Sequence, residues 1–469
     1  MEPRRAGRPR PDVAVTQMSS PAWRRVGRSG GETALEAPEI QRLLDEGVAS
    51  TAAYACANSP FYRRRFAEAG LGPEEIRSTD DLTRLEPTTK HDMAVHGDRL
   101  WCVPWERVVD VVTTSGTTGV PTLYPMTEAD IRRLGYNEFL SFSCAGLTRD
   151  DVVLVAVTLD KCFIAGLAYY EGLRQLGAAS VRVGSGSPLM LLSLLERLGA
   201  TAVVSVPTFL KRIAAYAAET GFDLAASSVR RLVCIGEPLR GQDFAPTPLG
   251  EQVAAAWGAE VYATYAATEL ACSLCECPAG RGGHLHPELL HVEILDDAGQ
   301  PVPDGQVGEV VATTFGVEAL PLLRFRTGDL AFLTRERCSC GRWTPRISPI
   351  VGRKNQMMKI KGTTVFPAAV QRALGRVDEV ADFVMIVTAP ELLSDHLEIV
   401  AAVRGDEAAA CQRIRDALRG ELRVTPSVRT APADEVARLQ APEGSRKKRL
   451  FIDRRGGAQT EAPPVQPSA

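Results

Sequence analysis

The stretch Val112–Thr122 concentrates hydroxyl groups around two glycines, Gly116 and Gly119, and follows the apolar run Val108–Val112. Glycines let the backbone approach a ligand closely, and consecutive amides in such turns form an anion-binding nest. Hydroxyl groups add neutral donors for phosphate oxygens. No Gly-Lys-Ser/Thr follows, so the loop is not a Walker A motif. Taken alone, it is either a phosphate-binding loop or a polar surface linker.

Two later segments place polar side chains where strands end or turn. The aromatic ring of Tyr265 can stack on a base, and the carboxylate of Glu269 can hold Mg²⁺ beside phosphates. Asp329 follows the tight turn at Gly328 and is suited to accept hydrogen bonds from two ribose hydroxyls. Each pattern is also common in packed strand ends and turns. Each therefore supports a nucleotide site only in combination with the other patterns.

Eleven cysteines are spread unevenly along the chain. Because no export signal is apparent, they are expected to be reduced thiols, and close spacing then suggests metal before disulfide. Zinc prefers four ligands, with soft sulfur and nitrogen donors. The chain offers such a set in Cys277, His284, Cys338 and Cys340. Alternative ligands are Cys272, Cys275 and His286, and the alternative to zinc is simple packing of reduced cysteines.

Composition narrows the classes of protein. A chain of 469 residues is too long for one ordinary domain. The net charge of −3 gives no electrostatic case for nucleic acid or membrane binding. No apolar run approaches 18 residues, and the arginine-rich N-terminus lacks the apolar core of a secretory signal. We therefore expect a soluble cytoplasmic protein.

Strands and helices alternate through the middle of the chain, which indicates a largely parallel, layered α/β sheet. Strands are predicted at 151–157, 180–183, 202–206, 231–235 and 260–263. Helices are predicted at 37–57, 61–69, 79–82, 127–142, 166–176, 189–198, 208–220 and 249–257. Ligands of such sheets bind outside the carboxyl ends of the strands, where Gly236 and Tyr265 fall.

The pattern changes twice after residue 285. Short strands at 290–295, 307–314 and 330–333 indicate a β-rich subdomain. Beyond it, helices at 367–374 and 406–422 and strands at 383–387, 397–403 and near Val428 indicate a small α+β domain. The predicted organisation is a disordered basic tail (1–35), a large domain (36–353), a small domain (354–455) and a disordered tail (456–469).

In their order and spacing, these segments resemble the adenylate-forming enzymes and, within them, the phenylacetate–CoA ligase-like family. The resemblance runs from about Asn58 to Arg455. Its marks are Ser59–Tyr62, Thr89-Lys90, Thr114–Thr122, Gly352-Arg353, Lys361-Gly362 and Phe366-Pro367. It implies an α/β fold, with a large N-terminal domain of layered α/β subdomains plus a β-rich subdomain, and a small, mobile α+β C-terminal domain.

The resemblance also implies roles for single residues. The ATP phosphates would be bound by Thr114, Ser115, Gly116, Thr117, Thr118 and Gly119. The adenine pocket would be lined by Gly236, Glu237, Pro238 and Tyr265. Thr268 would contact the phosphate and Glu269 would ligate Mg²⁺. Asp329 would hold the ribose hydroxyls, with Arg353 nearby.

Three further regions carry implied roles. Lys354 and Asn355 would form the hinge, at a position that is often Asp in the wider superfamily. One lysine of the cationic segment 444–453, Lys447 or Lys448, would contact the reacting carboxylate and the α-phosphate. The acyl pocket would include Asp160, Phe163, Ala165 and Gly166, which favour an apolar or aryl acid. The alternative there is a helix start packed on the sheet.

The implied reaction is ATP-dependent activation of a carboxylic acid to an acyl-adenylate with release of pyrophosphate, then transfer to coenzyme A. Alternative acceptors are an amine or a carrier-protein thiol. A catalytically inactive binding relative is a lesser alternative, against which Glu269, Asp329 and Arg353 argue. The implied cofactors are ATP, Mg²⁺, coenzyme A and a structural Zn²⁺, and relatives are commonly homodimers.

Overall fold

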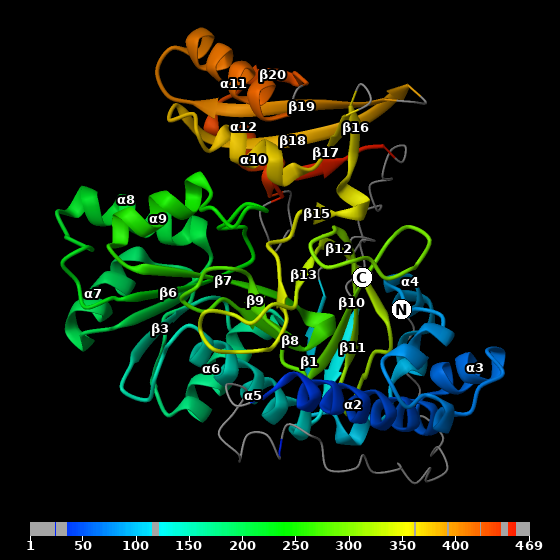
Figure 1. The fold of residues 1–469 in the computed structure, drawn as a ribbon. Helices are drawn as coiled ribbons and strands as arrows, with labels where there is room; N and C mark the ends of the chain where they lie inside the picture. The colour runs from blue at the N-terminus through cyan, green and yellow to red at the C-terminus, as the bar shows by residue number, and fades with distance from the viewer. Residues whose placement is uncertain are drawn as a thin grey trace, which may run out of the picture. The chain divides into compact units, whose positions relative to one another are not determined.

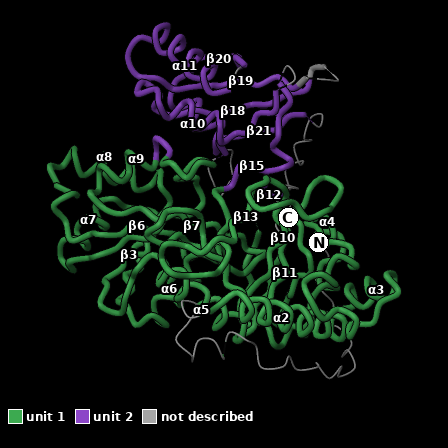
Figure 2. The backbone as a smooth tube through the Cα atoms, viewed as in Figure 1, with its two compact units in different colours: residues 1–246, 250–327, 331–349 green, residues 247–249, 328–330, 350–469 purple. Residues whose placement is uncertain are grey.

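The computed structural model describes residues 35–114, 122–360, 363–391, 394–422, 424–441 and 449–455, together with Arg24. The chain divides into two compact units (Figure 2). Unit 1 comprises residues 1–246, 250–327 and 331–349, and unit 2 comprises residues 247–249, 328–330 and 350–469. The predicted disordered tails lie outside the described residues, except for Arg24 and Leu35.

Six strands form the central sheet of unit 1, in the order β4-β3-β5-β6-β7-β8 (Figure 1). All neighbours are parallel except β8, which runs antiparallel to β7. Figure 1 shows α8 and α9 over one face, and α5 and α6 over the other. The strands are β3 (Val152–Ala156), β4 (Ala179–Arg182), β5 (Ala202–Ser205), β6 (Arg231–Ile235), β7 (Glu260–Ala267) and β8 (Cys272–Cys275).

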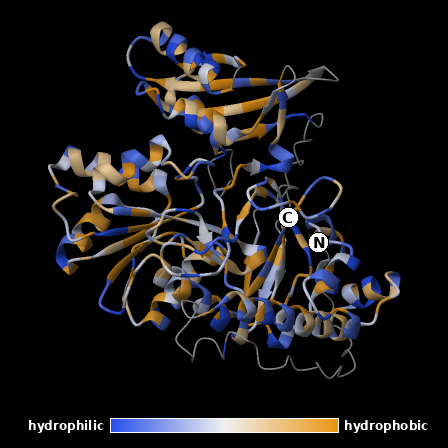
Figure 3. Ribbon diagram, in the orientation of Figure 1, coloured by the Kyte–Doolittle hydropathy of each residue, from blue (hydrophilic) through white to orange (hydrophobic). Residues whose placement is uncertain are grey.

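Helices cover both faces of the central sheet. Its inner strands are accordingly continuous runs of buried apolar residues (Figure 3). Proline and serine at helix starts, and glycine at helix ends, separate the strands from the helices. For α7, Ser187 accepts a hydrogen bond from Met190 N, and Gly199 ends the helix in the left-handed conformation. The helices are α5 (Glu128–Cys144), α6 (Ile164–Leu176), α7 (Pro188–Leu198), α8 (Pro207–Thr220) and α9 (Pro248–Trp257), whose first two residues belong to unit 2.

Smaller elements complete unit 1. The N-terminal helices are α2 (Ala37–Asn58), α3 (Pro60–Glu68) and α4 (Lys90–His96). β1 (Asp110–Thr113) pairs with β2 (Leu123–Met126), and β10 (Leu290–Leu295) with β11 (Gly308–Thr314), beside β12 (Phe325–Ala331), whose residues 328–330 belong to unit 2. Another sheet, of three strands, consists of β9 (Gly283–His284), β13 (Leu333–Thr334) and β14 (Arg346–Ile347).

Unit 2 is a small α+β fold built on the sheet β20-β19-β18-β21. Alternate residues of its strands face two helix layers: Met385 packs with the core of α10 and α11, and Val384 packs with that of α12. The helices are α10 (Pro367–Leu374), α11 (Glu407–Leu422) and α12 (Ala433–Gln440). The strands are β15 (Gly352–Arg353), β16 (Met358–Ile360), β17 (Thr363–Val365), β18 (Val380–Glu391), β19 (Ser394–Val403), β20 (Ser427–Thr430) and β21 (Phe451–Asp453).

The α/β class predicted from the sequence is confirmed, while several element bounds were wrong. The predicted strand at 330–333 is the junction between β12 and β13. β12 was not predicted as a strand because it contains Arg326 together with Gly328 and Asp329, which are uncommon in strands. Its side chains nevertheless alternate between buried and half-buried, as in a strand. The predicted short helix at 79–82 is a 3₁₀ turn at Asp80–Arg84. Among the described residues, no helix is long and apolar enough to cross a membrane.

Glu138 lies buried where α5 packs closely on α6. A Cβ atom at Gly172 would lie 2.2 Å from the Glu138 Cβ, so glycine is needed for this approach. Burial raises the pKa of Glu138 from 4.5 to about 8, against a smaller opposing effect of a hydrogen bond with Ser273. Its Oε2 atom has no hydrogen-bond partner in the described structure. The side chain is therefore held mainly in its neutral form near pH 7.

We expect Glu138 to make stability depend on pH. Its folded pKa lies above its unfolded value, so its stabilising contribution is complete below about pH 4.5 and is lost as the pH rises through about 8. The free energy of unfolding should fall across this window by on the order of a few kcal/mol. Urea unfolding between pH 5 and 8.5 measures the slope, which Glu138→Gln should flatten and the exposed control Glu128→Gln should not. An unchanged slope in Glu138→Gln would contradict this assignment.

Candidate active site

The turn that carries Thr268 and Glu269 follows directly on β7. Thr268–Leu270 forms one 3₁₀ turn, closed by a 3.0 Å hydrogen bond from Ala271 N to the Thr268 carbonyl. Ala271 ends the turn in the left-handed conformation, with φ 45°. Glu269 is only 6% exposed. A cation bound by this carboxylate would neutralise a largely buried charge.

Lys90 places its ammonium group 3.8 Å from the Glu269 carboxylate. It is the first residue of α4, whose start is fixed by reciprocal hydrogen bonds between Thr89 and Asp92. Sequence reasoning gave Lys90 no chemical role. The available signal was the capping-box spacing from Thr89 to Asp92, which indicates a helix opening with a lysine.

The residues predicted to line the adenine pocket lie at the ends of two neighbouring parallel strands: residues 236–238 follow β6, and Tyr265 lies within β7, which extends to Ala267 and not only to the predicted end at 263. Ile235 at the end of β6 pairs with Thr264 of β7, so Gly236 and Tyr265 come next in register. The Glu237 carboxylate accepts hydrogen bonds from Thr208 N (2.9 Å) and Thr208 Oγ1 (2.7 Å) at the start of α8. Burial raises the pKa of Glu237, and the bonds from Thr208 oppose this. Its side chain thus fixes the turn, with Pro238 next in the chain.

The predicted phosphate loop begins and ends on a pair of antiparallel strands. Thr113 pairs with Leu123, and Thr114 N donates to the Thr122 carbonyl at 3.0 Å, so the two ends of the loop are held together. The loop residues predicted to hold phosphate, Ser115, Gly116, Thr117, Thr118 and Gly119, lie outside the described residues. Thr114 itself is buried at the base.

The predicted acyl-pocket segment joins β3 to α6. Lys161 and Cys162 both have left-handed backbones, with φ 61° and 54°, and Thr113 N donates to the Cys162 carbonyl at 3.0 Å. This bond joins the segment to β1, just before the predicted phosphate loop. Phe163 and Ala165 pack against the core of the central sheet, and Asp160 is exposed.

Gly166 sits where the first turn of α6 meets the segment before it. A Cβ atom there would lie 2.4 Å from the Thr158 carbonyl oxygen. α6 begins at Ile164, two residues before the predicted start. The close approach accounts for glycine at this position by packing alone.

Asp329 and Arg353 lie opposite each other in unit 2, where β12 pairs with β15. Arg353 Nε is 3.0 Å from Asp329 Oδ1, and the Asp329 side chain is 8% exposed. Gly352 leaves no room for a side chain, because a Cβ atom would lie 2.4 Å from the Phe366 ring. The arrangement is a rigid pair of strands that presents one acceptor group and one cation.

The predicted hinge segment is held by the last described residue of unit 2. Arg455 donates to the carbonyls of Asn355 (3.0 Å) and Met357 (2.6 Å) and pairs with Asp395. Lys354 and Asn355 form a 3₁₀ turn with Gln356. The candidate catalytic lysines, Lys447 and Lys448, lie outside the described residues.

Four side chains from two distant segments of unit 1 converge on one point. The ligand atoms of Cys277, His284, Cys338 and Cys340 all lie within 4.8 Å of one another. Cys277 Sγ is 3.6 Å from Cys338 Sγ, and His284 Nε2 is 3.4 Å from Cys340 Sγ. Cys272, Cys275 and His286, the alternative ligands, are not part of this cluster.

The chemistry of this cluster suits a zinc ion. Burial lowers the pKa of His284 to about 3, so the imidazole is neutral, the form that binds metals. Its Nδ1 atom is hydrogen-bonded to Thr344 at 2.8 Å, which leaves Nε2 towards the thiols. Burial opposes ionisation of Cys340, yet hydrogen bonds with Arg342 lower its pKa overall. Three sulfurs and one nitrogen make a structural donor set for zinc.

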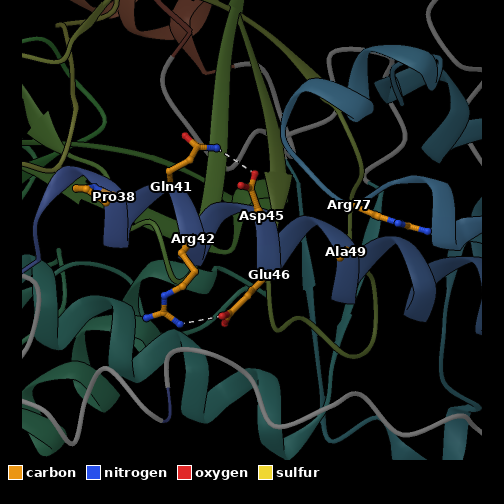
Figure 4. A pocket seen from close by; sticks show the side chains of 7 residues that line it. All are labelled: Pro38, Gln41, Arg42, Asp45, Glu46, Ala49 and Arg77. Atoms are coloured by element: carbon orange, nitrogen blue, oxygen red, sulfur yellow. Dashed lines mark hydrogen bonds and ion pairs between the residues drawn. The ribbon is translucent and has the colours of Figure 1, made fainter.

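A shallow depression elsewhere on unit 1 contains none of the predicted site residues (Figure 4). Its polar groups pair along α2, as in Gln41 with Asp45 (3.0 Å) and Arg42 with Glu46 (2.8 Å). It is lined by Pro38, Gln41, Arg42, Asp45, Glu46, Ala49 and Arg77. The candidate chemistry therefore lies at the strand ends rather than in this depression.

The chain resembles known proteins over most of its length. The AMP-binding enzyme family model matches residues 69–318. Phenylacetate-coenzyme A ligase of Thermus thermophilus is 32% identical over 370 residues, covering 78% of this chain and 82% of the relative. The Escherichia coli ligase of the same name is 29% identical over 377 residues, covering 78% and 80%.

Solved structures show the same fold. A 2-hydroxyisobutyryl-CoA ligase in the postadenylation state has a TM-score of 0.75 at 23% identity, over 90% of this chain and 91% of that one. An anthranilate CoA ligase in complex with anthranoyl-AMP has a TM-score of 0.53 at 18% identity, over 69% and 63%.

The family match and the fold are those of an adenylate-forming, AMP-binding enzyme. Within that class the chain belongs to the phenylacetate–CoA ligase-like family, as its sequence resemblance implies. It is an AMP-forming acid–CoA ligase: it activates a carboxylic acid with ATP as an acyl-adenylate and transfers the acyl group to coenzyme A.

Proposed function

We propose that the acid is aryl or otherwise apolar. The family match supports this, since the curated relatives are phenylacetate-coenzyme A ligases. The observation that supports the proposal is the hydrogen bond from Thr113 N to the Cys162 carbonyl, which joins the segment proposed to contact the acid to the strand before the proposed phosphate loop. Phe163 and Ala165 supply apolar surface in that segment.

We propose that the strand-end residues bind ATP and position its α-phosphorus. The loop that starts at Thr114 grips the phosphates, and Tyr265 stacks on the adenine beside Gly236. Asp329 accepts from the ribose hydroxyls, while Arg353 holds its carboxylate in place. Thr268 donates to the phosphate, and Glu269 holds Mg²⁺, which would neutralise charge on the leaving pyrophosphate. Lys90 provides a countercharge for Glu269 before the metal binds.

We propose that residues 354–455 form a C-terminal domain whose hinge is Lys354 and Asn355. This domain rotates about the hinge before the second step, the transfer of the acyl group. The lysine at 447 or 448 serves adenylation, and its withdrawal opens a path for the acceptor thiol. We further propose that the four-ligand cluster binds one structural zinc ion. A homodimer and a cytoplasmic location are predicted from the resemblance and the sequence.

The test is pyrophosphate release with ATP and a panel of aryl and alkyl acids. We expect release with one or more aryl or apolar acids, and stimulated product formation when coenzyme A is added. Parallel reactions with amines and with a carrier protein measure the alternative acceptors. Release with only small polar acids would overturn the proposed acid class, and no release with any acid would favour an inactive binding relative.

A further inference from the structure

The side chain of Arg133 is buried inside unit 1 and joins three separate segments. It is 1% exposed, on the second turn of α5. Its three nitrogens donate to the main-chain carbonyls of Phe315 (2.5 Å), Ala271 (2.6 Å) and Leu289 (2.7 Å). Because a buried guanidinium is costly unless its donors are satisfied, this arrangement constrains all three carbonyls at once.

One of those carbonyls belongs to Ala271, the residue that ends the Thr268–Glu269 turn. The turn itself is closed by one hydrogen bond, from Ala271 N to the Thr268 carbonyl. The left-handed backbone of Ala271 (φ 45°) costs roughly 1 kcal/mol for a residue with a Cβ atom. The turn therefore needs support from outside, and Arg133 bonds directly to its last residue.

The same face of α5 continues to hold the chain beyond the turn. Asn137 Oδ1 accepts from Ser273 N (2.7 Å), and Asn137 Nδ2 donates to the Ser273 carbonyl (3.0 Å). Ser141 also bonds to Ser273, with Oγ–Oγ 2.9 Å. Arg133, Asn137 and Ser141 are spaced by four, so they form a ladder on one helix face, which we call the α5 ladder. The ladder thus binds the main chain at Ala271, before β8, and at Ser273, within β8.

We propose that Arg133 is a positioning residue for Glu269. It acts through the Ala271 carbonyl, fixing the turn so that the Glu269 carboxylate keeps one orientation when it takes up a metal ion. The inference rests on the proposed role of Glu269 in holding Mg²⁺. The planar guanidinium of arginine can donate to three carbonyls in fixed directions. Lysine cannot reproduce this arrangement, because all its donors are on a single nitrogen.

The test compares Arg133→Lys with a matched control, Arg324→Lys. Arg324 is also buried (4% exposed) and bonds to Glu293 and to the carbonyls of Thr83 and Leu85, away from the turn. We expect Arg133→Lys to raise the Mg²⁺ concentration for half-maximal pyrophosphate release by about 10-fold or more. Arg324→Lys should stay near the wild-type value. An equal shift in both variants would overturn the inference.

Hydrogen exchange of peptides covering residues 264–272 measures the turn without relying on metal. We expect faster exchange in Arg133→Lys and wild-type exchange in Arg324→Lys; exchange as in wild type in both would overturn the inference. Glu269→Gln separates the two proposals. If that variant keeps the wild-type Mg²⁺ requirement, the metal role of Glu269 fails, while the exchange data still decide whether Arg133 orders the turn.

A double-variant cycle completes the test. If Arg133 acts through Glu269, Arg133→Lys should change the Mg²⁺ requirement little once Glu269 is Gln, and full additivity would contradict that route. If Arg133→Lys does not fold, Asn137→Ala replaces it in the same exchange and Mg²⁺ measurements, because it releases Ser273 two residues beyond Ala271.

Discussion

Replacing Lys447 and Lys448 together by alanine is expected to lower pyrophosphate release by about 10³-fold, because adenylation loses a cation that stabilises charge in the transition state. Both lysines belong to a segment whose two ends are joined in unit 2: Arg449 N donates to the Gln440 carbonyl at 2.7 Å. β21 follows immediately and pairs with β18. The end of α12 and the residues just before β21 are therefore held together by this hydrogen bond.

Transfer to coenzyme A from a preformed acyl-adenylate should stay near the wild-type rate in the same variant, since that step does not use the lysine. The single variants then assign the role to Lys447 or Lys448. Arg449→Ala, which removes an exposed cation next to them, is the charge-matched control. Pyrophosphate release within tenfold of wild type in the double variant would show that the lysine assignment is wrong.

Purified protein is expected to contain about one zinc ion per chain, and Cys338→Ser is expected to lose it. Cys277 and Cys338 are 61 residues apart, so a shared ion would cross-link two distant segments of unit 1. The loss should lower the melting temperature by on the order of 10 °C, because a structural zinc contributes directly to folding stability. Elemental analysis and thermal unfolding measure the two effects.

Cys275→Ala is the control for the zinc prediction. Cys275 is fully buried in the same unit and lies outside the cluster, so its variant should keep the ion. Activity per folded molecule should survive in zinc-free protein at low temperature, because the proposed role is structural. Wild-type protein without zinc, or Cys338→Ser with a full equivalent, would contradict the proposal.

The sequence was informative where chemistry is carried by local spacing. Cys338 and Cys340 are two residues apart, and their donor types point to a partner set that the fold brings together with Cys277 and His284. The alternation of apolar runs and helical segments likewise predicted the parallel sheet, because buried strands need continuous apolar residues. Gly236 marked a real bend after β6, with φ 78°, whereas the turn predicted at Gly328 was wrong: Gly328 has the same φ but lies within β12.

Contacts between distant segments could not be predicted in this way. Nothing local to Arg133 indicates that its partners are the carbonyls of residues 271, 289 and 315. The ion pair of Lys90 with Glu269 spans 179 positions and depends on where α4 packs. β12 was misplaced because its buried positions include the polar Thr327 and Asp329, and its pairing with β11 and β15 decides its conformation.

Arg455, which follows β21, donates hydrogen bonds to the carbonyls of Asn355 and Met357, and so ties the C-terminal end of the small α+β fold to its N-terminal segment. Chimeras that exchange this fold between relatives should therefore be joined before Asn355 and should retain Arg455. A chain cut after Asp453 would leave those two carbonyls without their guanidinium donor. A segment exchanged between relatives should thus contain Arg455 as well as the four-stranded sheet that precedes it.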